Sequence, residues 1–282
     1  VHLGHRAVIR TAVEGAAETG GLAGVLTFEP HPIQVLAPEK APRRILASIE
    51  HKERVLAAMG VSVLVVLPFT REFAERSASD FAEALFSAPG DLRQISVGED
   101  WMFGHGRHGT AGMLRALGEG RGVEVSTLAP VMERGERISS TRIRQAIRDG
   151  NLTAAAAMLG RPYTVLGSVV KGRQLGGKIG VPTANIEVGS EQLPPDGVYV
   201  VTVTLNGDRL PGVGNLGMRP TVNGKARLLE VHLFDFTDTI YGREIEVEFG
   251  RFLRGEVKFD GIDALKTQIA KDIGEARSDH GI

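Results

Sequence analysis

Two histidines near the start of the chain form a pattern that could bind the triphosphate of a nucleotide. His2 and His5 flank Gly4 in the order His-x-Gly-His, and the apolar spacing over residues 6–18 predicts that they open a helix. The free N–H groups and the dipole of a helix N-terminus attract phosphate. Imidazoles placed there can donate hydrogen bonds to an α-phosphate as charge builds on its oxygens during adenylyl transfer. Taken alone, two solvated capping histidines are the simpler interpretation.

A second phosphate-binding pattern lies at residues 138–144 and favours the functional interpretation. Ser139 and Ser140 are good helix caps whose hydroxyls can reach phosphate. Thr141 and Arg144 are three residues apart and therefore share a helix face, where an arginine can bind phosphate oxygens bidentately. Two arginines in a first helical turn oppose the helix dipole unless an anion offsets them. A basic surface helix is therefore the weaker alternative.

Together the two motifs resemble the nucleotidylyltransferase pattern, and further segments narrow the family. Residues 27–32 (Thr-Phe-Glu-Pro-His-Pro) and 98–104 (Gly-Glu-Asp-Trp-Met-Phe-Gly) look like the flavin-adenylating branch found in bacterial bifunctional riboflavin kinase/FAD synthetases. Residues 182–185 (Pro-Thr-Ala-Asn), 215–221 (Asn-Leu-Gly-Met-Arg-Pro-Thr) and 229–232 (Leu-Glu-Val-His) follow in the order seen in riboflavin kinase domains. The resemblance covers essentially the whole chain.

The resemblance implies a bifunctional transferase with riboflavin, FMN and ATP as its small-molecule partners. The C-terminal domain is expected to phosphorylate riboflavin to FMN with MgATP, and the N-terminal domain to adenylylate FMN to FAD with release of pyrophosphate. It assigns the adenylyl site to His2, Gly4, His5, Ser139, Ser140, Thr141 and Arg144, and flavin contacts to His31, Asp100, Trp101, Phe103, Arg219 and Arg254. Core packing is an equally good interpretation of Phe103. For the two arginines, exposed charge at the end of a strand is the alternative.

The segment 172–178 (Gly-Arg-Gln-Leu-Gly-Gly-Lys) nearly matches a P-loop, but Ile179 stands where the metal-binding serine or threonine should follow. We therefore reject a Walker-type site. The glycines instead predict a loop whose N–H groups wrap the phosphates of ATP. The residues expected in this loop are Gly172, Gly176, Lys178 and Gly180.

Thr183 and Asn185 are two residues apart on an extended segment, which directs a hydroxyl and an amide oxygen to one side as ligands for Mg²⁺. A turn that satisfies its own backbone is the lesser alternative. Alternation places Leu229 and Val231 toward a core and Glu230 on the other face. The resemblance makes Glu230 the base that orients the ribityl hydroxyl and accepts its proton late in phosphoryl transfer.

Residues 104–109 (Gly-His-Gly-Arg-His-Gly) match the dinucleotide fingerprint Gly-x-Gly-x-x-Gly, and we reject this match. The acidic residue that should end the next strand is missing from residues 125–128, and the fingerprint belongs on the first strand of its fold. A mobile glycine-rich loop is the better interpretation.

Composition excludes several classes of function. The 282 residues suggest about two domains, and 42% hydrophobic residues can bury real cores. A net charge of −1 with 5% aromatic residues gives no case for a nucleic-acid-binding tract. No apolar run approaches the length of a membrane span, and no signal peptide or cysteine is present, so a soluble cytoplasmic protein is expected. The oligomeric state stays open between a monomer and a weak homo-oligomer.

The predicted fold is α/β followed by β. Strand-like runs at 24–28, 61–67, 95–97 and 123–128 alternate with helical patterns, which predicts a Rossmann-like parallel sheet, with 61–67 fully buried. Ser48 is expected to cap one helix of this half and Ser79 or Asp80 to start another. An alanine-rich helix ending at Gly160 divides a domain of residues 1–160 from one of residues 161–282.

The second domain is predicted to be a small antiparallel barrel with a C-terminal helix. Strand-like runs lie at 163–170, 197–205, 228–234 and 244–249, and Asn206-Gly207 forms a hairpin turn. Asp260 is expected to cap the helix, with Ile262, Leu265, Ile269 and Ile273 on its apolar stripe.

Family members carry a strand and a Phe-Asp turn before the first histidine, whereas this sequence begins at Val1. The first domain is therefore expected to lack its first strand, which would impair adenylylation more than the kinase. Two alternatives follow from this: a riboflavin kinase with an inactive first domain, or a flavin-binding regulatory protein without turnover.

Overall fold

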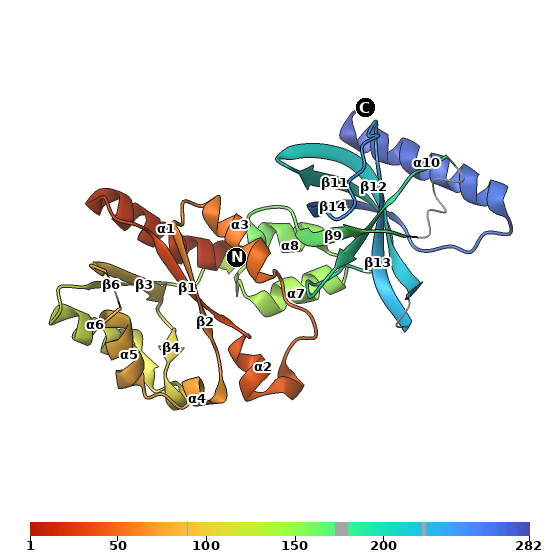
Figure 1. Cartoon of the computed structure of the whole chain (residues 1–282). Coiled ribbons are helices and arrows are strands. Elements are labelled where there is room, and N and C mark those ends of the chain that lie inside the picture. Colours follow the sequence, from red (N-terminus) through yellow and green to blue (C-terminus); the bar gives the residue numbers. More distant parts are fainter. Residues whose placement is uncertain (89, 173–179, 222–223) are drawn as a thin grey trace. The chain divides into compact units, whose positions relative to one another are not determined.

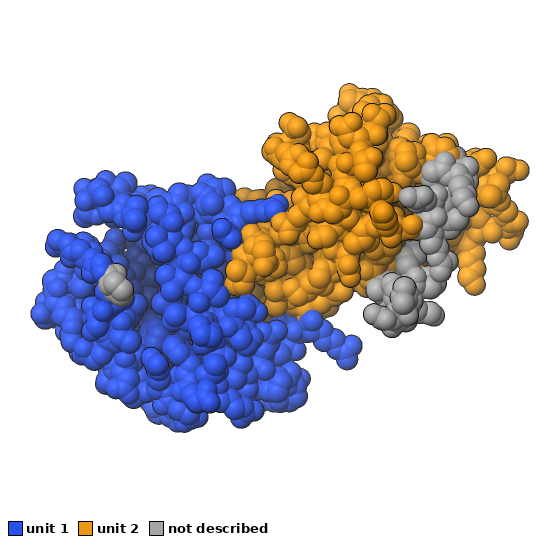
Figure 2. Space-filling model, viewed as in Figure 1, with its two compact units in different colours: residues 1–43, 52–139 blue, residues 44–51, 140–282 orange. Residues whose placement is uncertain are grey.

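The computed structural model describes residues 1–88, 90–172, 180–221 and 224–282, with side chains described outside residues 219–226. The chain divides into two compact units (Figure 2). Unit 1 comprises Val1–Arg43 and Lys52–Ser139, and unit 2 comprises Arg44–His51 and Ser140–Ile282. Residues 44–51, early in the chain, thus fold with the C-terminal half.

Unit 1 contains two pairs of parallel strands surrounded by helices (Figure 1). Its main strands are β1 (Gly24–Glu29), β2 (Val63–Pro68), β3 (Gln94–Gly98) and β6 (Glu124–Leu128), and short hairpin strands are β4 (Met102–Phe103), β5 (Gly109–Thr110), β7 (Met132–Glu133) and β8 (Glu136–Arg137). Its helices are α1 (Leu3–Thr19), α2 (Pro32–Leu36), α3 (Ile49–Ala57, whose first residues belong to unit 2), α4 (Arg71–Ala74), α5 (Ala78–Phe86) and α6 (Ala111–Glu119), with 3-10 turns η1 (Pro38–Lys40) and η2 (His105–Arg107).

The four predicted strands are confirmed as parallel elements, since β1 pairs with β2 and β3 pairs with β6. Among the described residues no hydrogen-bonded strand joins the two pairs into one sheet. The prediction that residues 61–67 are fully buried is wrong, because Val63, Val65 and Val66 are 41%, 40% and 38% exposed. The reason is that β2 has one neighbouring strand, so part of its surface lies uncovered at the edge of a two-stranded pair.

Of the helix starts predicted at Ser48 and at Ser79 or Asp80, one is right and one is late. Ser48 accepts the backbone N–H of His51 at 3.2 Å, as expected for the cap of α3. The predicted start of α5 is two or three residues too late, because Ser77 accepts the N–H of Asp80 at 3.0 Å and nucleates the helix earlier. Several serine and aspartate residues in succession offer competing caps there, and only one can accept the first free N–H group.

Unit 2 is a closed six-stranded barrel with the strand order β10-β13-β12-β11-β14-β9 (Figure 1). This confirms the predicted antiparallel barrel. Its strands are β9 (Thr164–Val170), β10 (Ala184–Val188), β11 (Gly197–Leu205), β12 (Asp208–Thr221), β13 (Gly224–Leu233) and β14 (Glu244–Arg254), and its helices are α7 (Ser140–Arg148), α8 (Leu152–Leu159) and α10 (Ile262–His280). Asn206 and Gly207 both have positive φ, at 53° and 96°, which confirms the primed hairpin turn.

Helix α10 covers the outer face of β11 and β12. Val198, Val200, Val213 and Phe234 form a buried cluster with Ala276 of the helix, and Ile273 packs against it. The prediction that Asp260 caps this helix is wrong, because the cap position is Gly261 and no side chain accepts its first N–H groups. Ile262, the first residue of the helix and of the predicted apolar stripe, is 60% exposed.

Residues 44–51 bind to the barrel through backbone and side-chain hydrogen bonds, and we call this segment the strap. The N–H of Ile45 donates to Ser190 O at 2.9 Å, and the N–H of Gln192 donates to Ile45 O at 2.7 Å. Arg44 Nη1 donates to Glu191 O at 2.8 Å. In the described part of the chain, no helix has the length and apolar character needed to cross a membrane.

Candidate active sites

The first helix positions the two histidines of the predicted adenylyl site in unit 1. His2 is the N-cap of α1, and its Nδ1 accepts the backbone N–H of His5 at 3.3 Å. The two rings stack with centroids 3.8 Å apart. A Cβ on Gly4 would lie 3.1 Å from the His2 ring, so a glycine here leaves the imidazole room to fold over the first turn. The structure thus brings His2, Gly4 and His5 together at one helix N-terminus.

The surroundings of both imidazoles favour the uncharged ring at neutral pH. Burial, together with nearby positive charge that includes Arg137, lowers the pKa of His2 to about 4. Desolvation and the adjacent His2 ring likewise lower the pKa of His5. Because His2 Nδ1 accepts the capping hydrogen bond, the proton of the neutral ring is on Nε2, where it can be donated to a phosphate oxygen.

The predicted second half of the adenylyl site is the first turn of α7, in unit 2. Arg144 Nη2 donates to Thr141 Oγ1 at 3.3 Å, which confirms that the two residues share a helix face. Ser140 is the first residue of the helix, and Ser139 precedes it. Burial and the neighbouring Arg148 lower the pKa of Arg144. A cation destabilised in this way gains from a bound anion such as phosphate.

The predicted flavin-contact residues of unit 1 lie after β1 and β3. His31 caps α2, and its Nδ1 accepts the N–H of Ile33 at 3.3 Å. Asp100 is ion-paired with Arg137, which lowers the pKa of its carboxyl group. The rings of Trp101 and Phe103 stack at 4.7 Å. Phe103 is 7% exposed and belongs to the buried core, so the more accessible face of this pair is Trp101.

The glycine-rich segment 104–109 forms no dinucleotide-binding turn, in agreement with the sequence-based prediction. It joins the antiparallel strands β4 and β5 through the 3-10 turn η2, with Gly104 and Gly106 at φ 72° and 61°. A dinucleotide fingerprint would instead connect a parallel strand directly to a helix.

Three polar residues form a row across the outer face of the barrel in unit 2. Asn185 of β10 is directly opposite Glu230 of β13, and Glu230 is directly opposite Asn215 of β12. The neighbouring Leu229 and Val231 are 0% and 1% exposed and face the barrel core, which confirms the predicted alternation. Directly opposed residues on antiparallel strands have Cβ atoms about 5 Å apart, so a small ligand can contact all three.

Gly172 approaches this row closely. A Cβ at position 172 would lie 2.1 Å from Asn185 Nδ2, so any larger residue there would force the carboxamide to move. Asn185 itself is 6% exposed, and Thr183 precedes it by two residues. Gly180 has φ 85°, a value that favours glycine. Of the other predicted loop residues, Gly176 and Lys178 lie outside the described residues.

His232, which ends the quoted motif 229–232, and the predicted flavin residues Arg254 and Arg219 have different surroundings. His232 Nδ1 donates to Pro182 O at 2.8 Å and so holds the segment before Asn185 against β13. Arg254 forms a forked ion pair with Asp272, with Nη2 to Oδ2 at 2.7 Å and Nε to Oδ1 at 3.0 Å, which joins β14 to α10. Arg219 lies on β12, paired in register with Ala226.

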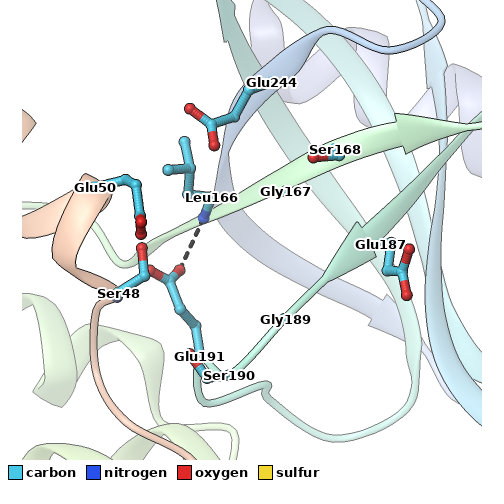
Figure 3. A pocket seen from close by; sticks show the side chains of 10 residues that line it. All are labelled: Ser48, Glu50, Leu166, Gly167, Ser168, Glu187, Gly189, Ser190, Glu191 and Glu244. Carbon is cyan, nitrogen blue, oxygen red and sulfur yellow. Dashed lines mark hydrogen bonds between the residues drawn. The ribbon is translucent and has the colours of Figure 1, made fainter. Parts of the chain in front are cut away.

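A pocket of about 360 Å³ lies elsewhere in unit 2, beside the strap (Figure 3). Glu50, Glu187, Glu191 and Glu244 line it, and Figure 3 shows Glu191 turned toward the Leu166 N–H, which donates to it at 2.8 Å. Its carboxylates repel phosphate, and its lining includes none of the residues of the polar row. The row on β10, β13 and β12, and not this pocket, therefore suits a phosphorylated ligand.

Sequence reasoning missed two features of unit 2. The first is the position of Asn215, which begins one of the quoted motifs but is shown to lie opposite Glu230 only by the strand register. The buried contacts of His51 were also missed. Its Nδ1 donates to Glu191 Oε1 at 2.8 Å, 140 residues away in the sequence, and no local pattern signals such a pair.

Comparisons with known proteins agree with this arrangement. A family model described as FAD synthetase matches residues 1–142, and one described as riboflavin kinase matches residues 159–279. Bifunctional riboflavin kinase/FMN adenylyltransferases from Escherichia coli K12 and Bacillus subtilis are 40% and 36% identical, over 100% and 98% of this chain and 90% and 88% of theirs.

A crystal structure described as a macrolide-efflux protein from Streptococcus pneumoniae is 34% identical and superimposes with a TM-score of 0.83, over 96% of this chain and 88% of its own. The sequence relatives, which this chain matches along 98–100% of its length, and the two family models agree on one family. The chain therefore belongs to the family of bifunctional riboflavin kinases/FMN adenylyltransferases, transferases that phosphorylate riboflavin to FMN and adenylylate FMN to FAD.

Proposed function

We propose that phosphoryl transfer to riboflavin takes place at the polar row of β10, β13 and β12, with Glu230 as the catalytic base. The observation that carries this proposal is the strand register, in which Glu230 is directly opposite Asn185. Gly172 lies close to the carboxamide of Asn185. A carboxylate is too weak a base to deprotonate a primary alcohol outright. Glu230 therefore orients the ribityl hydroxyl and accepts its proton as the bond from that oxygen to the γ-phosphorus forms and ADP leaves.

Thr183 and Asn185 are proposed to hold a divalent metal ion, Mg²⁺, together with the phosphates of ATP. The donors suit this ion, since a hydroxyl and a carboxamide oxygen are hard ligands on one side of an extended segment. When bound, the metal neutralises charge on the transferring phosphates. Gly172 keeps the Asn185 carboxamide in place, and the loop from Gly172 to Gly180, with Gly176 and Lys178, is proposed to surround the phosphates.

Adenylylation of FMN is proposed to use His2 and His5 with Arg144. The neutral imidazoles donate hydrogen bonds to the α-phosphate as charge builds on it, and Arg144 binds phosphate oxygens at the start of α7 beside Ser139, Ser140 and Thr141. His31, Asp100 and Trp101 are proposed to contact the flavin of FMN, with Phe103 supporting Trp101 from the core. Arg219 and Arg254 are proposed to lie near the flavin of the kinase site.

We further propose domains of residues 1–160 and 161–282 and a cytoplasmic location, where ATP is supplied.

The test is chromatographic separation of flavins after incubation of the chain with riboflavin and MgATP, for the wild type and for Glu230→Gln. The wild type should form FMN and FAD, whereas Glu230→Gln should form neither from riboflavin but still adenylylate added FMN. Flavin binding should persist, because the amide is isosteric with the carboxylate. Normal turnover of riboflavin by Glu230→Gln would contradict the assignment of the base. Formation of FMN without FAD by the wild type would locate a defect in the adenylyl site.

A further inference from the structure

Asn215 carries a buried acceptor atom that no described residue satisfies. Its Oδ1 is shielded from solvent and has no hydrogen-bond partner in the described part of the chain. A buried carbonyl oxygen without a partner costs free energy, and nearly all such atoms in folded proteins have one. An orphan acceptor inside a candidate site therefore suggests that a ligand provides the donor.

Asn215 lies on the outer face of the barrel, between the surface that helix α10 covers and the polar row that contains Glu230. On one side it is directly opposite Val198, which is 4% exposed and belongs to the apolar cluster beneath α10. On the other side it is directly opposite Glu230. Directly opposed residues point to the same face of an antiparallel sheet, so Asn215 and Glu230 present adjacent polar groups on the outer face of the barrel.

We propose that Asn215 is a substrate-positioning residue of the riboflavin kinase reaction, whose Oδ1 accepts a hydrogen bond from the ribityl hydroxyl next to the one that is phosphorylated. This inference rests on the proposed role of Glu230 as the base. The chemistry selects the ribityl chain over the phosphates of ATP, because the ionised phosphates offer acceptors only, whereas the ribityl chain offers a series of hydroxyl donors. Two neighbouring acceptors on neighbouring strands match two neighbouring hydroxyl groups on one chain.

The test uses the matched variants Asn215→Val and Asn215→Thr, which differ only in a methyl or hydroxyl group and are both favoured in strands. Valine removes the acceptor, so the KM for riboflavin should rise about tenfold, the usual worth of one such hydrogen bond. Threonine retains an acceptor and should restore part of this loss. The KM for ATP and the metal concentration that gives half-maximal activity should not change in either variant.

A riboflavin analogue that lacks the ribityl hydroxyl next to the primary one completes the cycle. The wild type should lose about the same tenfold with this analogue, and Asn215→Val should show no further loss, because the two changes remove the same hydrogen bond. If Asn215→Val raised the KM by the same factor for riboflavin and for the analogue, the proposal would be overturned. A changed ATP KM or metal dependence would overturn it in favour of a metal or nucleotide contact.

Stability separates positioning from a structural role. Without ligand, Asn215→Val should unfold at the same temperature as the wild type or higher, since an unsatisfied buried acceptor has been removed. Riboflavin should then raise its unfolding temperature by less than in the wild type. A lower unfolding temperature without ligand, with normal riboflavin stabilisation, would make Asn215 structural and end the proposal. Failure of the base assignment would appear separately, as retained turnover in Glu230→Gln.

Discussion

Replacing His51 with leucine should destabilise unit 2 by about 3 kcal/mol while leaving unit 1 nearly unchanged. His51 is 0% exposed, and its Nε2 lies 3.1 Å from Thr164 Oγ1 and 3.3 Å from Glu246 Oε1, opposite the bond to Glu191. Without the imidazole, Glu191, which is 1% exposed, becomes a buried carboxylate without its cation. Removing one partner of a buried ion pair costs about 3–5 kcal/mol.

The lower end of that range applies for two structural reasons. Glu191 keeps two backbone donors, the N–H groups of Ser48 and Leu166, each at 2.8 Å. The side chain of Glu246 is 23% exposed, so water can solvate it after the change. A loss of this size is a large part of the 5–15 kcal/mol that usually stabilises a domain.

The loss should also depend on pH. Burial alone would lower the pKa of His51, but hydrogen bonds and charge from Glu191 and Glu246 outweigh it, so the pKa is raised above 6.5. The same contact with His51 lowers the pKa of Glu246 to about 2. Between the unfolded and folded pKa values of His51, the folded state binds the extra proton, so stability falls as pH rises. The difference between wild type and His51→Leu should therefore be full between about pH 4.5, the ordinary pKa of Glu246, and pH 6.5, and should shrink as pH rises through the folded pKa of His51.

Urea unfolding can follow the two units separately. The single tryptophan, Trp101, lies in unit 1, whereas all three tyrosines, at positions 163, 199 and 241, lie in unit 2. The tyrosine signal in near-UV circular dichroism should shift in His51→Leu and the tryptophan fluorescence should not. The control is His105→Leu, which removes an exposed pair with Glu75 and should change stability by less than about 0.5 kcal/mol. An unchanged tyrosine transition, or a loss that increases with pH, would refute the reasoning.

Two further changes test the packing around the kinase site. Gly172→Ala should reduce riboflavin phosphorylation at least tenfold, as measured by FMN formation, because its Cβ would lie 2.1 Å from the Asn185 carboxamide. The control Gly189→Ala, whose Cβ would have no atom within 4 Å, should keep full activity. Equal activity of the two variants would contradict the proposed role of Gly172. Asp272→Asn should lower the free energy of unfolding by about 1–3 kcal/mol, because it weakens the forked pair that Arg254 forms with a 7% exposed side chain, and an unchanged unfolding temperature would show that the pair contributes nothing.

Local patterns predicted well those features that depend on neighbouring residues in the chain. The helix that starts after His2, the turn at Asn206-Gly207 and the alternation around Glu230 all appear in the structure. Each follows from the geometry of a few consecutive residues, such as a capping side chain, a positive φ or a two-residue period. Where several caps competed, as before α5, the prediction missed by two or three residues.

The family was likewise visible in the sequence, because the order of the motifs resembled the one that the comparisons then identified. Only the tertiary structure decided which strands are neighbours. Register places Asn215 beside Glu230, and the strap brings His51 to Glu191 from 140 residues away. Such contacts depend on how the barrel closes and on the burial of charge, and both are set by the whole fold and not by any local run of residues.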